Sequence, residues 1–479
     1  MSDRFDDLAV PMDPAAFART RQAALARLEA ATAGRAPGTT DPVTVVPFDD
    51  RVPARAVRAR RWLAVAVAAA LLVVGLVIAT RSRKGSSPVG PVPTTVVPST
   101  TTTGLPGGAA LGPANPATGT PVTVGFVTDG VTAADSGGPE VAAAQAATRY
   151  VNDRLGGIAG HPIALSVCNT HNVPADATAC AQQLLGQGAV TVLSNRALQA
   201  TLVEAGVETA KVAFFAYDSA AGEGYSSNLM TDGVGTIHVP IKAALDNGIK
   251  RVGLINIDIN LGGGIRATQE PTYKAAGLVP DFVAIKPDAP DITGVLQPFL
   301  LANPDEVVLN VTPELCARVL PVLRALDYRG AVYLNPLCLS AGLNAQVPGG
   351  LAGFKIVITQ ATDPADPELK LYHDVMSAYA AGVDPDGNFT SGGFAVVLGF
   401  RRAMSALTGD VTPSAVREAL HSMAPQAMPL VSNATFQCSG TLVVGLSGVC
   451  STVALLATLD AQGVAQDAKP VDVSGIANT

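Results

Sequence analysis

Residues 122–168 read VTVGFVTDGVTAADSGGPEVAAAQAATRYVNDRLGGIAGHPIALSVC, and this stretch decides the fold. Its first residues, VTVGFVTD (122–129), form a short run rich in β-branched side chains, which is typical of a buried strand. A Gly/Ser loop then leads into an alanine-rich segment that predicts a helix from Pro139 to Leu155, and PIALSVC (162–168) predicts a second strand. A strand, a helix and a strand in this order indicate two parallel strands of one sheet.

The same alternation continues toward the C-terminus. Strands are predicted at 189–194 and 212–217, with helices near 175–187 and 196–210. The pattern then starts again, with strands predicted at 251–258, 278–285, 305–311, 331–337 and 354–359. We therefore predict an α/β protein with two successive parallel-sheet units. A helix at 392–407, rich in small residues on one side, is expected to pack back against the first unit.

One uninterrupted apolar run, WLAVAVAAALLVVGLVIAT (62–80), divides the chain. As a helix it would be about 28 Å long, close to the hydrocarbon thickness of a bilayer. Five arginines lie in the flank 51–61 and three basic residues in the flank 81–84, which favours a cytoplasmic N-terminus. About 60 mostly polar residues come first, unlike in a cleaved signal peptide. We therefore predict an uncleaved signal-anchor that makes the protein a single-pass protein of the cell membrane.

The predicted transmembrane helix also defines the other segments. Residues 1–61 are predicted as a cytoplasmic tail, 81–120 as a Pro/Thr/Gly-rich stalk, and 121–479 as the extracytoplasmic domain. The formal net charge of the whole chain is −7, which argues against a nucleic-acid partner.

All six cysteines lie beyond the apolar run, and an even number of cysteines suits an oxidising compartment. Their spacing forms three local couples, which predicts the disulfides Cys168–Cys180, Cys316–Cys338 and Cys438–Cys450. Each would contribute about 3 kcal/mol if unstrained. A metal cluster is the alternative, and the sequence shows no CxxC or Cys/His spacing of the zinc type.

Motifs for catalysis or cofactor binding do not stand out in the sequence. The glycines after the 251–258 strand, NLGGGIR, do not form G-x-G-x-x-G, and neither HExxH nor G-x-S-x-G occurs. We therefore predict no cofactor, no metal and no enzymatic activity. A catalytic triad assembled only in the folded chain stays an open alternative.

Specific residues carry a resemblance to a known family. The first predicted helix ends in Val151, Asn152, Gly156, Gly157, Ile158 and Gly160, and Phe436 to Gly440 precede a final strand VALLATLDAQG. Together with the opening VTVGFVTDG, these residues resemble the type I periplasmic (solute) binding proteins of the branched-chain amino-acid transport family, which includes leucine-binding protein. The resemblance covers the chain from residue 121 onward.

The resemblance implies two α/β lobes joined by three hinge crossings, with a small ligand held between the carboxyl ends of both sheets. The first lobe would take in about 121–245 and 388–435, and the second about 250–385. A disulfide-closed C-terminal segment would follow at 436–479. The ligand position also agrees with physical expectation, because loops at strand ends and helix N-termini offer free N–H groups to a polar ligand.

The candidate ligand-binding residues are polar residues that follow the predicted strands. They are Asp129, Ser136, Ser194, Asn195, Tyr217, Asp218 and Ser219 in the first lobe, and Asp258, Asn310, Thr312 and Asn335 in the second. Each of these residue types is also common in turns and helix caps. As a set, we expect them to converge on one cleft.

Two positions depart from the pattern of amino-acid binders in the family. The resemblance implies Ser/Thr groups for a ligand carboxylate, which Ser194 and Ser219 match. The acidic position for a ligand ammonium is occupied by Leu337, and Thr312 replaces an expected aromatic residue. Asp218 or Asp258 would then have to supply the opposite charge.

These observations predict a membrane-anchored, extracytoplasmic solute-binding protein. It would capture a small polar or amphipathic ligand, such as an amino acid or amide, and present it to the membrane-spanning permease of an ABC-type transporter. One alternative is a ligand-sensing receptor that signals through the transmembrane helix and the cytoplasmic tail. Another is an extracytoplasmic enzyme or scaffold with the same fold.

Overall fold

The computed structural model describes residues 111–130, 138–195, 197, 199–218, 226–230, 232–258, 262–339, 342–387, 389–444 and 446–477. The predicted tail, apolar run and most of the predicted stalk lie outside these residues. None of the helices in the described part of the chain is both long enough and apolar enough to cross a membrane. Gly104–Thr479 forms one compact unit.

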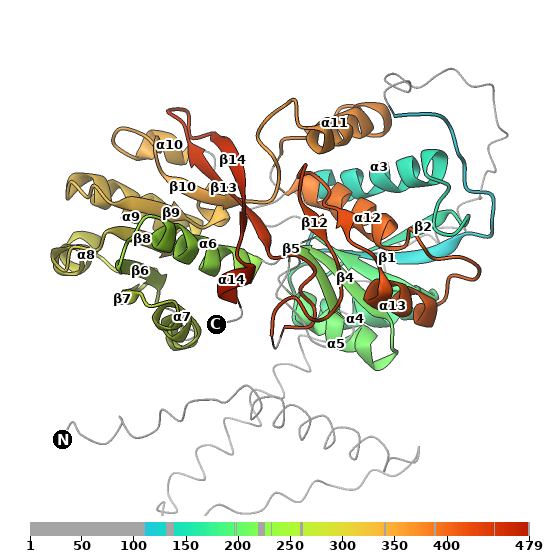
Figure 1. The fold of residues 1–479 in the computed structure, drawn as a ribbon, viewed down its shortest axis with the longest axis horizontal. Coiled ribbons are helices and arrows are strands. Elements are labelled where there is room, and N and C mark those ends of the chain that lie inside the picture. Colours follow the sequence, from blue (N-terminus) through green and yellow to red (C-terminus); the bar gives the residue numbers. More distant parts are fainter. Residues whose placement is uncertain are drawn as a thin grey trace, which may run out of the picture. The chain divides into compact units, whose positions relative to one another are not determined.

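The first lobe is built on a parallel sheet. In the described residues it has 5 strands in the order β2-β1-β3-β4-β5. The strands are β1 (Val122–Thr128), β2 (Ile163–Asn169), β3 (Thr191–Ser194), β4 (Ala213–Asp218) and β5 (Ser226–Met230). Strand β1 pairs in parallel with β2 on one side and with β3 on the other, which confirms the expected parallel sheet. Figure 1 shows β1, β2, β4 and β5 together in this lobe.

Helices cover both faces of this sheet. On one face, α3 (Gly138–Arg154), α11 (Pro367–Tyr379) and α12 (Thr390–Ala403) share an apolar core with Phe126 and Phe215. On the other, α4 (Pro174–Gly186) and α5 (Ala200–Thr209) pack on Val127 and Phe214. Helices α3 and α12 approach closely, because a Cβ atom at Gly393 would lie 2.1 Å from the carbonyl oxygen of Glu140. The small residues of α12 therefore serve helix packing, as the sequence predicts.

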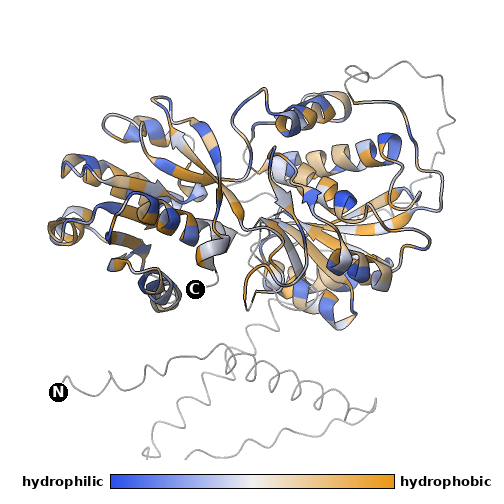
Figure 2. Cartoon of the chain, viewed as in Figure 1, coloured by the Kyte–Doolittle hydropathy of each residue, from blue (hydrophilic) through white to orange (hydrophobic). Residues whose placement is uncertain are grey.

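In the part of the second lobe that the structure describes, a mixed sheet has 7 strands in the order β14-β13-β10-β9-β8-β6-β7. The parallel strands are β6 (Arg251–Ile257), β7 (Val279–Ile285), β8 (Glu306–Asn310), β9 (Ala331–Leu334) and β10 (Lys355–Ile358). Strands β13 (Val453–Leu459) and β14 (Ala465–Asp472) run antiparallel at one edge. Figure 2 shows apolar colour along the strands and polar colour on the outer helices.

Helices also cover both faces of the second sheet. Helices α8 (Ile292–Leu301), α9 (Pro313–Ala325) and α10 (Leu343–Gln346) share a core with β8 and β9 on one face. Helices α6 (Asp232–Asp246), α7 (Gly262–Ala275) and α14 (Ser474–Ala477) cover the other. The remaining elements, α13 (Pro413–Ser422), β11 (Gln426–Ala427) and β12 (Thr435–Phe436), belong to the first lobe.

The lobe boundaries differ from those predicted. Helix α6 packs on β10 and β13 and so belongs to the second lobe, whereas the sequence placed residues up to 245 in the first. Helix α11 packs on α3 in the first lobe, although 250–385 was assigned to the second. The C-terminal segment completes the second sheet through β13 and β14. Helix packing depends on residues distant in the chain, so local patterns do not reveal it.

The last ten residues of the predicted stalk pack on the first lobe. Backbone N–H groups of Asn115 and Ala117 donate to the carbonyl oxygens of Asp153 and Asn152, at 2.9 and 2.8 Å. Leu111 is 5% exposed. Residues 111–120 therefore form a strap on the lobe rather than part of a free stalk.

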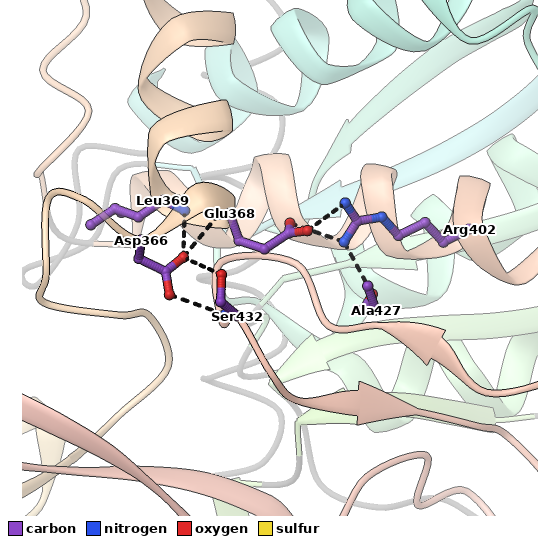
Figure 3. Close-up of polar contacts among 6 residues, drawn as sticks. All are labelled: Asp366, Glu368, Leu369, Arg402, Ala427 and Ser432. Carbon is purple, nitrogen blue, oxygen red and sulfur yellow. Dashed lines mark hydrogen bonds and ion pairs between the residues drawn. The ribbon is translucent and has the colours of Figure 1, made fainter.

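The chain passes between the lobes three times, after β5, after β10 and before β13. The second passage, residues 359–366, ends in a polar cluster at the start of α11 (Figure 3). Asp366 caps this helix, because its Oδ1 accepts from the N–H groups of Glu368 and Leu369 at 2.8 and 3.1 Å. Ser432 donates from its Oγ and its backbone N to the same carboxylate, at 2.8 and 3.2 Å.

A bidentate ion pair completes this cluster. Both terminal nitrogens of Arg402 on α12 donate to the two carboxylate oxygens of Glu368, at 2.9 and 3.0 Å. The side chains are 19% and 16% exposed, so water screens the pair only weakly. Arg402 also donates to the carbonyl oxygen of Ala427 at 3.0 Å. The cluster thus fixes the end of the second passage to two separate segments of the first lobe.

Three disulfides join the cysteines in the sequential pairs that the sequence predicts. They are Cys168–Cys180, Cys316–Cys338 and Cys438–Cys450. Cys168–Cys180 joins β2 to α4 in the first lobe. Cys316–Cys338 joins α9 to the short helical turn 336–338 in the second lobe. The third closes the segment that leads into β13.

Replacing Glu368 by Gln should destabilise the protein, because it leaves the Arg402 guanidinium without its carboxylate in a poorly hydrated place. We expect the free energy of unfolding to fall by about 2 kcal/mol, somewhat less than for a fully buried pair. The measurement is denaturant-induced unfolding. The matched control is Glu270→Gln, since Glu270 pairs with Arg266 and Lys274 on an exposed helix and should cost about 0.5 kcal/mol. Equal costs for the two variants would contradict this role of the Glu368–Arg402 pair.

Glu306 is a buried acid at the amino end of β8. Its side chain is fully buried, and neither carboxylate oxygen finds a hydrogen-bond partner among the described residues. Burial, followed by the nearby charge of Asp305, raises the pKa of Glu306 to about 8. Burial and the charge of Glu306 also raise the pKa values of Tyr273 and Tyr333. The folded protein therefore holds Glu306 in its neutral form at neutral pH.

This pKa shift predicts a pH dependence of stability. The folded state binds a proton that the unfolded state releases above its ordinary pKa of about 4.5, so this stabilisation is complete below that pH. It should be lost as the pH rises to about 8, at roughly 1.4 kcal/mol per pH unit. Glu306→Gln should remove this loss, and the exposed Glu314→Gln should keep it. Parallel unfolding free energies for wild type and Glu306→Gln from pH 5 to 8 would contradict the assignment.

Candidate functional site

Buried polar residues lie at the carboxyl ends of the first lobe's strands. Asp129 follows β1 and accepts a hydrogen bond from the hydroxyl of Thr170. Ser194 ends β3, is fully buried, and its Oγ has no hydrogen-bond partner among the described residues. Asn195 and Tyr217 are 3% and 1% exposed. The parallel register brings these strand ends to one edge of the sheet, as the sequence predicts.

A chain of amides lies at the corresponding edge of the second lobe. Asn310 donates from Nδ2 to Oδ1 of Asn256 at 3.1 Å, and Asn256 donates to Oε1 of Gln269 at 3.3 Å. Asn256 and Gln269 were not predicted as site residues. Asn256 stands between Ile255 and Ile257 in β6. A single polar residue inside an otherwise apolar strand was the sequence signal that could have identified it as a site residue.

A cavity of about 540 Å³ borders the first of these regions and has walls from both lobes, but Asn256, Gln269 and Asn310 are not among its described lining residues. The first lobe contributes Asn195 and Tyr217 to its walls, together with the loop and first turn of α12 (386–392). The second lobe contributes Ile356 and Ile358 of β10 and residues near β9. The passage 359–364 forms a further wall. Residues of both lobes therefore surround one space, which reaches the carboxyl ends of β3, β4, β9 and β10 and also the turn between β13 and β14.

Asn195 is held against the first turn of α12. Its Nδ2 donates to the carbonyl oxygen of Phe389 at 3.2 Å. Phe389 precedes the helix with a φ of 62°, and a Cβ atom at Gly392 would lie 1.9 Å from Oδ1 of Asn195. Glycine at 392 is thus required for the close approach of this amide. The hydroxyl of Thr390 is buried without a hydrogen-bond partner among the described residues.

Tyr217 links the two lobes. Its hydroxyl donates to the carbonyl oxygen of Thr359, the first residue after β10. The ring belongs to the core of the first lobe and also lines the cavity. A ligand beside this ring is therefore adjacent to a contact that joins the lobes.

Among the described lining residues, one histidine and one carboxylate lie within hydrogen-bond distance of each other. Nε2 of His373 on α11 lies 3.2 Å from Oδ1 of Asp386 in the loop before α12. No lysine or arginine occurs among the described residues that line the cavity. The remaining wall is mostly apolar, with Leu339, Ile356 and Ile358 from the second lobe. The cavity therefore suits a molecule with an apolar part and few charges.

The structure brings two of the predicted residues, Asn195 and Tyr217, to the cavity wall. The predicted residues that it places at strand ends outside the lining are Asp129, Ser194, Asp258, Asn310, Thr312 and Asn335. Asp218 is the last residue of β4, and Ser136 and Ser219 lie outside the described residues. The passage 359–364 and the start of α12 were not predicted. For the start of α12, the available signal is the small-residue stretch GNFTSGG (387–393), of which the predicted packing helix 392–407 includes only the two final glycines.

The described residues contain no group of three or more His, Cys, Asp or Glu side chains placed to hold a metal ion.

Comparison with known proteins identifies the family. The model of the family described as periplasmic binding protein matches residues 121–463. The chain belongs to the periplasmic binding protein family. No curated protein sequence is significantly similar to the chain.

Solved structures of the family share this fold. An ABC transporter substrate-binding protein from Sphaerobacter thermophilus is 16% identical, with a TM-score of 0.60, and the match covers 74% of this chain and 100% of that one. A fatty acid ABC transporter substrate-binding protein from Thermomonospora curvata is 18% identical, with a TM-score of 0.57 and coverages of 75% and 95%. The branched-chain amino acid transporter substrate-binding protein of Streptococcus pneumoniae, solved with isoleucine, is 15% identical, with a TM-score of 0.55 and coverages of 73% and 99%.

Replacing Gly392 by Ala should disturb the site, because the added Cβ would have to displace the amide of Asn195. We expect the free energy of unfolding to fall by about 1–3 kcal/mol, as for other overpacked positions. Gly186→Ala is the matched control, since a Cβ there meets nothing within 4 Å and should stabilise the helix by up to about 1 kcal/mol. Denaturant unfolding measures both. A Gly392→Ala protein as stable as wild type would mean that Asn195 is not held as described.

Proposed function

We propose that this protein is an extracytoplasmic solute-binding protein that captures a small molecule between its two lobes and presents it to an ABC-type transporter. The observation that carries the proposal is the cavity of about 540 Å³ with walls from both lobes. Cavities of roughly 300–1,000 Å³ are typical of small-molecule sites. Membership of the periplasmic binding protein family supports the same function.

Ligand binding would bring the two lobes closer together. Three passages join the lobes, and the cavity wall includes the second of them. A ligand that contacts both lobes at once binds the closed form better than the open form, so it shifts the population toward closure. Such a cycle involves no reaction and no cofactor. The closed form would then be the form that the membrane-spanning permease recognises.

The lining indicates a polar or amphipathic ligand, such as an amino acid, an amide or a related compound. Because the lining formed by the described part of the chain holds no lysine or arginine, a ligand carboxylate would rely on neutral donors such as the Asn195 amide and the N–H groups at the start of α12. Asp386 is the acidic group available to a ligand ammonium. The apolar wall of Ile356 and Ile358 would hold the hydrocarbon part. The relatives from T. curvata and S. pneumoniae, named for fatty acids and branched-chain amino acids, support a ligand with apolar surface.

We also propose that the apolar run 62–80 anchors the binding domain in the membrane, with residues 1–61 in the cytoplasm. The support is the length of the run and the arginine bias of its flanks. Tethering would raise the concentration of the binding domain near a membrane-bound transporter. The protein should stay with membranes after alkaline carbonate extraction, and deletion of 62–80 should release it. Release of the unaltered protein would contradict the anchor.

Calorimetric titration tests the binding function. The full chain should bind at least one compound in a panel of amino acids, amides, short- and long-chain carboxylates and aromatic acids. Asn195→Ala should weaken that binding about tenfold, as expected for the loss of one good polar contact of about 1.4 kcal/mol. The matched control, Asn247→Ala, changes an exposed amide that donates to the carbonyl oxygen of Ala243 and should bind like wild type. A panel without a ligand, or equal affinities for both variants, would count against the proposed site.

A further inference from the structure

A second, polar cavity lies within the first lobe. It has a volume of about 370 Å³, and none of its lining residues lines the cavity between the lobes. Its walls are the turn after α3 (Leu155–Gly160), the strap residues 115–118 and the end of α12 with the residues that follow it. The turn contains the glycines of the family motif. The cavity therefore lies where three segments distant in sequence meet.

Arg401 brings an unpaired positive charge to this cavity. One terminal nitrogen donates to the carbonyl oxygen of Leu155 at 3.0 Å, and the buried Nε has no hydrogen-bond partner among the described residues. No carboxylate in the described part of the chain pairs with this guanidinium, in contrast to the neighbouring Arg402. Burial lowers the pKa of Arg401, which reflects the cost of keeping the charge there. A half-buried cation without a partner is expensive, so a ligand that supplies an opposite charge would be favoured.

The other polar groups around Arg401 add hydrogen-bond donors. Within the described residues, the backbone N–H groups of Ala159 and Gly160 have no acceptor, and Thr118 and Ser405 contribute hydroxyls. No aspartate or glutamate is among the described residues that line the cavity. Residues 51–128, the stretch that leads up to and through the strap, contain no acidic residue either. The segment that leads into the strap therefore brings no carboxylate of its own to this arginine.

We propose that this cavity binds a small soluble anion with a carboxylate or phosphate group, held by Arg401. The guanidinium would pair with the anion's oxygens, and the N–H groups of the Ala159–Gly160 turn and the nearby hydroxyls would complete its hydrogen bonds. Because the strap forms one wall, the bound anion would also fix residues 115–118 to the lobe. The site is separate from the cavity between the lobes, and it does not depend on which solute that cavity takes.

Thermal unfolding of the full chain tests the proposal, with inorganic phosphate and citrate as probes and sodium chloride of equal ionic strength as reference. At about ten times the dissociation constant, a probe should raise the Tm of the wild type by about 2 °C. Arg401→Gln removes the charge and should abolish this shift. Ser405→Asp places a carboxylate four residues from Arg401 and should abolish it as well by satisfying the arginine from within the chain.

The matched control is Arg266→Gln, which changes an exposed arginine of the second lobe and should keep the wild-type shift. The proposal is overturned if neither probe raises the wild-type Tm beyond sodium chloride, or if Ser405→Asp keeps the full shift. An unchanged shift in folded Arg401→Gln would overturn it too. Because Ser405 is exposed, the Ser405→Asp variant should fold, and it tests the proposal even if Arg401→Gln does not fold.

Discussion

The ion pair between Glu368 and Arg402 fixes the point where the chain returns from the second lobe to the first. Together with the Asp366 cap, it ties the beginning of α11 to α12 and to the segment around Ser432. The passage 359–364 before it is one wall of the cavity between the lobes. The shape of that cavity therefore depends on an interaction that lies outside it.

Helix α12 connects this support to the cavity. In its first turn, Gly392 lies against Asn195 and Gly393 allows close contact with α3, whereas its far end carries Arg402. Because α12 is packed in the core of the first lobe, the part of the cavity wall formed by its first turn is held in a fixed position. Tyr217 joins that wall to the second passage between the lobes, because its hydroxyl donates to the carbonyl oxygen of Thr359, directly after β10. Closure about a solute would need these contacts to persist while the lobes rotate about the passages.

The sequence predicts the central parallel strands of both lobes, because buried parallel strands are short β-branched runs that need no distant information. It does not predict the edge strands β5 and β14, whose sequences SSNLM and AQDAKPVD are largely polar. It does not predict which lobe α6 and α11 join, since that depends on packing between distant segments. The same limit applies to the site. Asn195 and Tyr217 were found because they follow strands, whereas the passage 359–364 and the turn before α12 carry no such periodic signal.

The central claim is that one small molecule contacts both lobes in the cavity between them. A crystal structure of the protein with the ligand that co-purifies with it, or with the tightest binder in the panel, tests this claim most directly. The account predicts that the ligand touches Asn195 or Tyr217 on one side and Ile356 or Ile358 on the other, with the lobes closed around it. A ligand that contacts only one lobe, or that lies outside this cavity, would contradict the account.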